Sequence, residues 1–306
     1  MDNGSTDGSP QMVESDYPQV RLIRNSENLG FPKAVNRGIG ESTGRYLALV
    51  NTDVFVEADS LSKLVAHLEK QPGVAGVGPQ LIDRSSHMQY CAGFSPSPAS
   101  ALRQLVGIHA FIGGRSRGVY VRSRFSSKEM NVDWLSGACQ VLRKTAIDSV
   151  GPMDESHFMY AEDTEYGLRM RDKGWRLQLL PWVRVLHLGG ASDKRDDRAD
   201  PQLLWLSGMF RIAAGRLSRV NYVLFGGLLG AAFYERALMI RCTNFFLRNR
   251  LGGVASVREV RAYARTALKL SLRDPKYAAE FCSQLESRRA EGWAKSANNY
   301  DESLGG

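Results

Sequence analysis

Apolar and polar residues alternate along the first part of the chain in segments of strand and helix length. Gln19–Arg24 alternates with the period of a short strand, and Arg45–Val50 is an apolar run of buried-strand length. Between them, Gly30–Ser42 carries apolar residues at helical spacing. A second helix is predicted over Ser60–Lys70, with Asp59 as its N-cap.

The same alternation continues further along the chain. Val74–Val77 predicts a strand that ends at Gly78-Pro79, and Val132–Arg143 predicts a strand region interrupted by Gly137. A helix over Asp163–Lys173 precedes two strands, Trp175–Leu180 and Val183–Leu188, which are split by Pro181. Residues 83–130 are rich in Pro, Ser and Gly and predict long loops. Strands that alternate with helices predict an α/β fold with a mostly parallel central sheet.

The pattern changes after Gly190. Residues 193–201 form a charged linker, and residues 202–306 are predicted to be wholly helical. We therefore expect an α/β domain over residues 1–192 and a helical C-terminal region over 202–306.

Charge and hydropathy distinguish the C-terminal region from the rest. Residues 1–193 hold 21 Lys+Arg and 21 Asp+Glu and are therefore neutral overall. Residues 194–306 hold 19 Lys+Arg and 11 Asp+Glu, which accounts for the whole net charge of +8. Tyr222–Tyr234 is apolar for 13 residues, shorter than the roughly 20 needed to span a bilayer, and arginines flank it. This pattern favours a helix that lies in an anionic membrane interface, although a helix buried against protein would show the same run.

Four cysteines lie far apart, without a CxxC pair or a nearby histidine at ligand spacing. This spacing argues against a structural zinc site and a disulfide framework, and it fits a reducing compartment. Residues 1–10 are polar and glycine-rich, unlike a secretory signal.

Acidic residues stand at two positions suited to chemistry. Asn51-Thr52-Asp53 directly follows the strand Arg45–Val50, where a carboxylate can hold a cation that bridges a diphosphate, or simply cap a turn. Glu162-Asp163 opens a predicted helix, where the carboxylates either cap the helix or act as a general base. His187 ends a predicted strand before Gly189-Gly190 and is equally suited to a structural role and to metal ligation.

Six ordered blocks resemble the family 2 glycosyltransferases, especially the bacterial rhamnosyltransferase-like members. The resemblance covers Asp2 to about Ser192 and rests on the segments Asp2–Gly8 (DNGSTDG), Asn28–Gly38 (NLGFPKAVNRG), Asn51–Asp53 (NTD), Trp134–Ala138 (WLSGA), Phe158–Trp175 (FMYAED, then GW) and His187–Gly190 (HLGG). It implies the GT-A fold, a nucleotide-binding α/β sandwich.

The resemblance also implies a role for each matching residue. Asp53 and His187 would bind a divalent cation, Mg or Mn, and Asp163 would be the catalytic base with Glu162 beside it. The donor nucleotide-sugar would be bound by Asp2, Asn28, Lys33, Asn36 and Asn51. Trp134 and Gly137 would lie on the acceptor side.

The resemblance further implies an inverting sugar transfer from a nucleotide-sugar, with rhamnose as a candidate sugar, to a hydroxyl of a lipid-linked or polysaccharide acceptor. The enzyme would be cytoplasmic and peripheral at the inner face of the cell membrane, and no nucleic acid is expected as a partner. The chain opens on what resembles the loop after the second strand of the domain, so we expect the family's first strand and helix to be missing from it. A non-catalytic glycosyltransferase-like partner protein and a sugar nucleotidyltransferase remain the alternatives.

Overall fold

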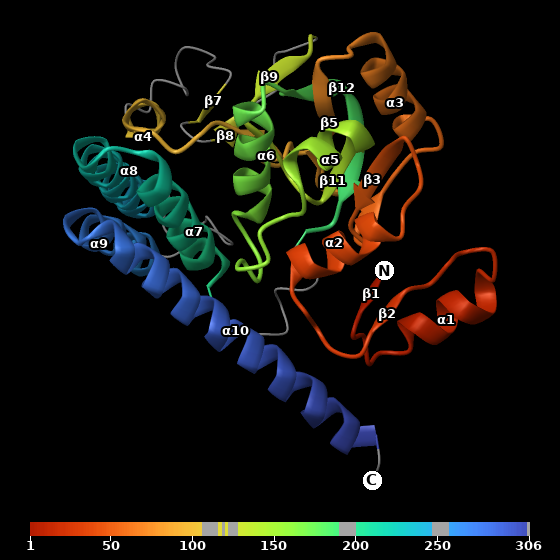
Figure 1. Ribbon diagram of the computed structural model, residues 1–306. Coiled ribbons are helices and arrows are strands. Elements are labelled where there is room, and N and C mark those ends of the chain that lie inside the picture. The colour runs from red at the N-terminus through yellow and green to blue at the C-terminus, as the bar shows by residue number, and fades with distance from the viewer. Residues whose placement is uncertain (106–115, 118–119, 122–127, 190–199, 247–256, 305–306) are drawn as a thin grey trace.

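A mixed central sheet organises the first two thirds of the protein (Figure 1). The computed structural model describes residues 1–105, 116–117, 120–121, 128–189, 200–246 and 257–304. The strand order of the sheet is β3 (Tyr46–Val50), β11 (Cys139–Arg143), β5 (Val74–Ile82), β12 (Arg176–His187) and β4 (Val54–Phe55), and β9 (Met130–Val132) also pairs with β12.

The prediction of an α/β fold is confirmed, but the sheet is not mostly parallel. β12 runs parallel to β5, whereas β11 is antiparallel to both β3 and β5, and β4 and β9 are antiparallel to β12. The expectation assumed a helix between every pair of neighbouring strands. β11 instead inserts between β3 and β5, and the chain from β5 to β11 passes through short strands and α4 (Pro98–Leu105).

Helices cover both faces of the sheet, and the side chains of β11 show how. Val141 points into the cluster that contains Leu64 and Leu68 of α3 (Ser60–Lys70). Leu142, one residue on, joins the cluster on the other face, which is covered by α2 (Phe31–Gly40), α5 (Lys144–Val150) and α6 (Glu162–Asp172). This alternation is the period of two expected of a strand buried on both faces.

Smaller sheets flank the core. β1 (Asp2–Asn3) pairs in parallel with β2 (Arg24–Asn25), next to α1 (Ser9–Asp16), and β10 (Trp134–Leu135), β6 (Ala92–Gly93), β8 (Tyr120–Val121) and β7 (Ser116–Arg117) form a four-stranded sheet. The strand predicted over Gln19–Arg24 is therefore wrong except at its last residue.

Several predicted boundaries also differ. β5 continues through Gly78-Pro79, and the two strands predicted around Pro181 form the single strand β12 with a register shift between Leu180 and Arg184. Pro181 lacks the N–H that a ladder needs, and the strand continues past it by bulging. Asp59 occupies the N-cap position of α3, as predicted, but its side chain makes no capping hydrogen bond and its carboxylate pairs with Lys63 at 2.6 Å.

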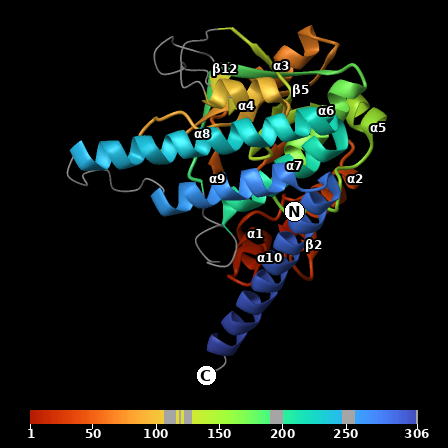
Figure 2. The ribbon, with the colours of Figure 1, turned by 90° about the vertical axis from the view of Figure 1, so that its left-hand side faces the viewer.

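The C-terminal region is helical, as expected. It comprises α7 (Pro201–Arg216), α8 (Arg219–Phe246), α9 (Val257–Leu272) and α10 (Pro275–Leu304), which lie on one side of the sheet domain (Figure 2). Their cluster of buried side chains includes Ala161 and Leu168 from the sheet domain, so the two regions share a hydrophobic core. Most of the predicted linker, residues 193–199, lies outside the described residues.

Candidate functional site

Asp53 and His187 are brought together by the pairing of two strands. β4 begins directly after Asp53 and pairs antiparallel with the end of β12, so that Val54 is the partner of His187. The N–H of Leu188 also donates to the carbonyl of Asp53 at 3.0 Å. Residues 134 positions apart in sequence therefore become neighbours at one end of the sheet.

The geometry of this pair fits a divalent cation. Oδ2 of Asp53 lies 3.5 Å from Nε2 of His187, and the side chains are 16% and 17% exposed. Two ligands that each lie about 2.1 Å from one cation are separated by roughly 3–3.5 Å. Because the side chains of Asp53 and His187 are partly open to solvent, a cation bound between them would keep coordination positions free for the oxygens of a diphosphate.

Asp163 lies at the start of α6, after two residues in an unusual conformation. Tyr160 and Ala161 have φ of 71° and 67°, which non-glycine residues rarely adopt. Such strain persists when packing imposes it, and it is concentrated at functional sites. Oδ1 of Asp163 accepts from the N–H of Thr164 at 2.6 Å, and Oδ2 accepts from the N–H of Gly137 at 3.4 Å.

The two adjacent acids are electrostatically different. Burial raises the pKa of Glu162 well above its ordinary value, and the negative charge of Asp163 raises it further. Oε2 of Glu162 is buried without a hydrogen-bond partner among the described residues. Burial also raises the pKa of Asp163, although hydrogen bonds from Thr164 and Gly137 oppose this. Burial therefore favours the protonated form of Glu162, whereas the hydrogen bonds from Thr164 and Gly137 favour the charged form of Asp163.

The turn Ser136-Gly137-Ala138 connects the two halves of the site. The carbonyl of Ala138 accepts from the N–H of Asn51 at 2.9 Å, and the N–H of Gly137 donates to Asp163. A Cβ on Gly137 would lie 2.8 Å from the ring of Phe31, so glycine permits this packing. Trp134 is buried in β10, just before the turn. The predicted acceptor-side segment thus contacts both Asn51 and the predicted base.

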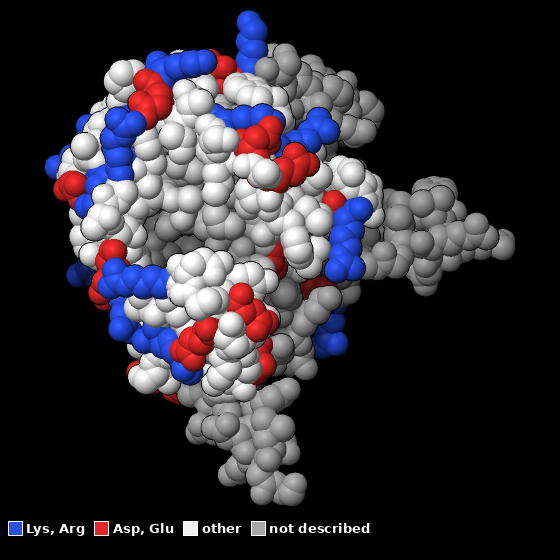
Figure 3. All heavy atoms as spheres, turned by 90° about the vertical axis from the view of Figure 1, so that its right-hand side faces the viewer, with Lys and Arg blue, Asp and Glu red and all other residues white. Residues whose placement is uncertain are grey.

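The predicted donor-binding residues lie in three places: Asp2 and Asn28 at the N-terminal sheet, Lys33 and Asn36 on α2, and Asn51 directly after β3. Asp2 is buried at 8% exposure and lines a hollow of about 370 Å³ with Ser5, Thr6 and Arg24. Figure 3 looks onto this side of the molecule and shows a hollow between its upper and lower parts. Oδ1 of Asn28 accepts from the side chain of Asn3 at 2.8 Å and from the N–H of Gly30 at 3.0 Å.

Asn36 and Lys33 lie on α2. The amide of Asn36 donates to the carbonyl of Met153 at 2.9 Å and accepts from its N–H at 2.8 Å, and it also donates to Glu155. These bonds hold α2 against the segment that leads to Glu162 and Asp163, so Asn36 has a structural role in this fold. The side chain of Lys33 is exposed.

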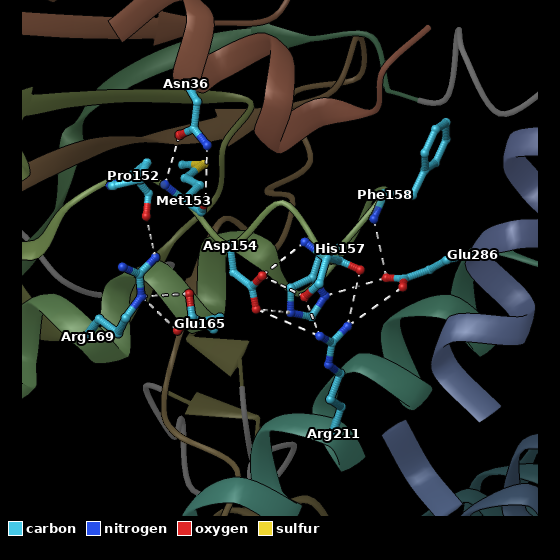
Figure 4. Close-up of polar contacts among 11 residues, drawn as sticks. Asn36, Pro152, Met153, Asp154, His157, Phe158, Glu165, Arg169, Arg211 and Glu286 are labelled. Carbon is cyan, nitrogen blue, oxygen red and sulfur yellow. Dashed lines mark hydrogen bonds and ion pairs between the residues drawn. The ribbon is translucent and has the colours of Figure 1, made fainter. Parts of the chain in front are cut away.

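The C-terminal helices contribute polar residues that the sequence did not reveal (Figure 4). Arg211 of α7 points between Asp154, His157 and Glu286, and its guanidinium lies 3.8 Å from both carboxylates. Glu286 of α10 is buried, accepts from the N–H of Phe158 at 3.4 Å, and lies 3.5 Å from Nδ1 of His157. Helices far along the chain therefore hold the segment that leads into Glu162 and Asp163.

This cluster includes the residue types of a metal site. One ligand atom each from His157, Cys282 and Glu286 lies within 4.8 Å of the others, and all three residues are buried. However, the guanidinium of Arg211 lies 3.8 Å from Glu286 and already supplies a positive charge there. This resident charge disfavours a cation, so we assign the cluster to holding the segment that leads into Glu162 and Asp163.

Comparisons with known proteins agree with the resemblance in sequence. Residues 1–125 match the model of glycosyl transferase family 2. Over 211 residues, which are 64% of this chain and 67% of the relative, the chain is 34% identical to the N-acetylglucosaminyl-diphospho-decaprenol L-rhamnosyltransferase of Mycobacterium tuberculosis. It is 28% identical over 213 residues to the O-antigen biosynthesis protein RfbC of Myxococcus xanthus, covering 67% of this chain and 16% of that protein.

Among solved structures, the chain is similar to the mannosyltransferase PcManGT from Pyrobaculum calidifontis in complex with GDP-Man and Mn2+. The identity is 17%, the TM-score is 0.48, and the match covers 95% of this chain and 76% of that one. The family match, the identity to the mycobacterial relative and its coverage show that this chain belongs to the family 2 glycosyltransferases.

Proposed function

We propose that this glycosyltransferase moves a sugar from a nucleotide-sugar to a hydroxyl of a lipid-linked or polysaccharide acceptor, with inversion at the anomeric carbon, in the synthesis of cell-surface glycans. The observation that carries the proposal is the partly accessible Asp163, held by Gly137 of the acceptor-side turn and raised in pKa by burial. The mycobacterial relative is named as a rhamnosyltransferase, so L-rhamnose is the first donor sugar to test.

The chemistry follows from the properties of the reacting groups. A sugar hydroxyl is a poor nucleophile at neutral pH, and a base with a pKa closer to neutrality removes its proton more effectively than an ordinary carboxylate does. Asp163 takes the proton as the hydroxyl oxygen bonds to the anomeric carbon. The bond from that carbon to the diphosphate breaks on the opposite face, so a single displacement inverts the configuration.

Asp53 and His187 are the residues that would hold the cation, because their ligand atoms lie 3.5 Å apart at the end of the sheet next to Asn51. A bound cation neutralises the negative charge that develops on the departing diphosphate. Asp2, in its hollow at the N-terminal sheet, would contact the nucleotide.

The test is a transfer assay with the full chain. A nucleotide-activated L-rhamnose and other nucleotide-sugars are offered with a polyprenyl-diphosphate-linked N-acetylglucosamine, in the presence of Mn2+ or of EDTA. We expect transfer that EDTA stops, and a product with the inverted anomeric configuration by NMR. A product with retained configuration contradicts the single displacement, and an unchanged rate in EDTA contradicts the role of the cation.

We further propose that α8 docks the enzyme on an anionic membrane at the cytoplasmic face. Large apolar side chains are exposed along this helix, among them Val220 at 68%, Leu238 at 59% and Met239 at 60%. Arg236 and Arg241 are exposed beside them. Such a combination suits a helix whose apolar side enters the lipid while its arginines meet acidic headgroups.

The length of α8 also permits a second arrangement. In the part of the chain that the structure describes, Arg219–Cys242 is long and apolar enough to cross a membrane, although 44% of the window is buried within the protein. The helix is thus longer than the apolar stretch predicted from the sequence. Since its buried side packs on α9 and α4, we favour docking at the interface over crossing.

Sedimentation with liposomes that contain phosphatidylglycerol tests this docking. We expect binding at low salt that the double change Leu238→Glu and Met239→Glu abolishes, whereas Val20→Glu, which alters an exposed apolar residue near the N-terminus, leaves it intact. Equal binding by all three proteins contradicts docking through α8. Resistance of the bound protein to alkaline carbonate extraction would indicate a crossing helix instead.

A further inference from the structure

Gln89 contacts His187 in two ways at once. Its Nε2 donates to the main-chain carbonyl of His187 at 2.9 Å, and its Oε1 lies 2.6 Å from Nδ1 of the same residue. Gln89 belongs to the segment 83–130, for which the sequence pattern predicted loops and no chemistry. None of the six blocks includes it.

These two contacts determine which ring nitrogen of His187 carries the proton. A carbonyl accepts hydrogen bonds, so the NH2 group of Gln89 must face the carbonyl of His187, and Oε1 then faces the ring. Because Oε1 is also an acceptor, Nδ1 must donate and therefore carries the hydrogen. In the neutral ring, Nε2 is then left with a free lone pair, and it lies 3.5 Å from Oδ2 of Asp53.

Gln89 is itself held in place. Its main-chain N–H donates to the carbonyl of Leu81 at 2.9 Å, and its carbonyl accepts from Nε2 of the buried Gln80 at 2.9 Å. Gln80 and Leu81 belong to β5, next to β12, which ends at His187. The amide that orients the histidine is thus anchored to the neighbouring strand of the central sheet.

We infer that Gln89 is a positioning residue that fixes His187 as the Nδ1–H tautomer, with Nε2 free to bind a divalent cation together with Asp53. This inference rests on the proposed function, in which His187 is a metal ligand. Metal-binding histidines commonly donate their second ring N–H to an acceptor of this kind, and losing the acceptor typically weakens metal affinity about 10–100-fold.

The first measurement needs no metal. The full chain is labelled with 15N-histidine, and the ring nitrogens are observed by long-range 1H–15N NMR at pH 8; His187→Asn identifies the signal of His187 among the five histidines. We expect an unprotonated Nε2 in the wild type and in Gln89→Glu, which keeps an acceptor at Nδ1. We expect Gln89→Leu to shift the ring toward the Nε2–H form that histidine favours in water. An Nε2–H ring in the wild type overturns the inference.

The second measurement is Mn2+ affinity by calorimetry. Gln89→Leu should weaken binding about 10–100-fold. Gln89→Glu, which keeps the acceptor at Nδ1 but loses the donor to the carbonyl of His187, should bind more tightly than Gln89→Leu. Gln11→Leu, at an exposed glutamine on α1, should leave the affinity unchanged. Equal affinity of Gln89→Leu and wild type overturns the positioning role. If neither the wild type nor Asp53→Asn binds Mn2+ but NMR shows the expected tautomer, the proposed cation-binding role of Asp53 and His187 is contradicted. The role of Gln89 in orienting the ring of His187 then stands.

Discussion

Gly208 of α7 packs directly against Ala161, the strained residue that precedes Glu162 and Asp163, the proposed catalytic acids. A Cβ at this position would lie 2.4 Å from the Cβ of Ala161, and Ala161 has a φ of 67°. Carbon atoms in van der Waals contact are about 3.5–4.0 Å apart. The substitution Gly208→Ala therefore forces α7 and the loop apart by more than 1 Å, or displaces Ala161.

The expected magnitude comes from two opposing effects. Overpacking of this size costs about 1–3 kcal/mol, whereas alanine is favoured over glycine inside a helix by about 0.5–1 kcal/mol. Gly215, on the same helix, provides the matched control, because a Cβ there would meet nothing within 4 Å. Gly215→Ala gains the helix preference without the clash, so the two variants should differ in stability by about 1–3 kcal/mol.

Urea denaturation of both variants measures this difference, and turnover measures its effect on the site. A displacement of about 1 Å at a catalytic group can lower the rate by about 100-fold, so we expect a large loss of kcat in Gly208→Ala and wild-type kcat in Gly215→Ala. If Gly208→Ala matches Gly215→Ala in stability and turnover, the contact with α7 does not hold the catalytic loop.

Three further predictions concern the acids themselves. Asp163→Asn keeps the hydrogen bonds from Thr164 and loses the weak one from Gly137, so we expect a stability change of about 1 kcal/mol and a loss of about 10²–10⁴ in kcat. The control Asp148→Asn, at an exposed ion pair on α5, should leave kcat unchanged. Normal turnover of Asp163→Asn would exclude Asp163 as the base. Because burial raises the pKa of Asp163 and the base must be ionised, kcat should fall as the pH is lowered through a value above the ordinary 3.8, and a midpoint at or below 3.8 contradicts the assignment. Because the pKa of Glu162 is raised in the folded protein, the folded state prefers the protonated carboxyl and loses stability as the pH rises from the ordinary 4.5 through the raised value. Urea denaturation should therefore show that Glu162→Gln is more stable than the wild type at pH 8 and no more stable at pH 4.

Local patterns in the sequence located most of the elements around the site. The helices α2, α3 and α6 and the strands β3 and β11 lie where the apolar spacing and the apolar runs placed them. The failures occur where tertiary pairing overrides a local signal. Pro79 and Leu180 are partners in the ladder between β5 and β12, and the register shift that follows accommodates Pro181, so neither proline ends its strand.

The sheet's strand order could not be derived from local signals either. The antiparallel β11 lies between β3 and β5 because the chain returns through α4 and the short strands rather than through a single crossover helix. That path depends on contacts between segments far apart in sequence. The same holds for the site: the ordered blocks identified Asp53 and His187, but nothing in them indicates Gln89, which is a partner of His187 only because β5 and β12 are neighbours.

The C-terminal helices support the segment around the proposed catalytic residues as well as forming the proposed membrane surface. Ala161 is fixed from one side by Gly208 of α7, and Phe158 is fixed by Glu286 of α10 through its N–H and by Phe31 of α2 through its carbonyl, at 2.8 Å. The unusual backbone at Tyr160 and Ala161 requires such support, since an unsupported loop would relax to ordinary φ values. The position of Asp163, the proposed base, therefore depends on α7 and α10, and these helices pack together with α8, which would meet the membrane.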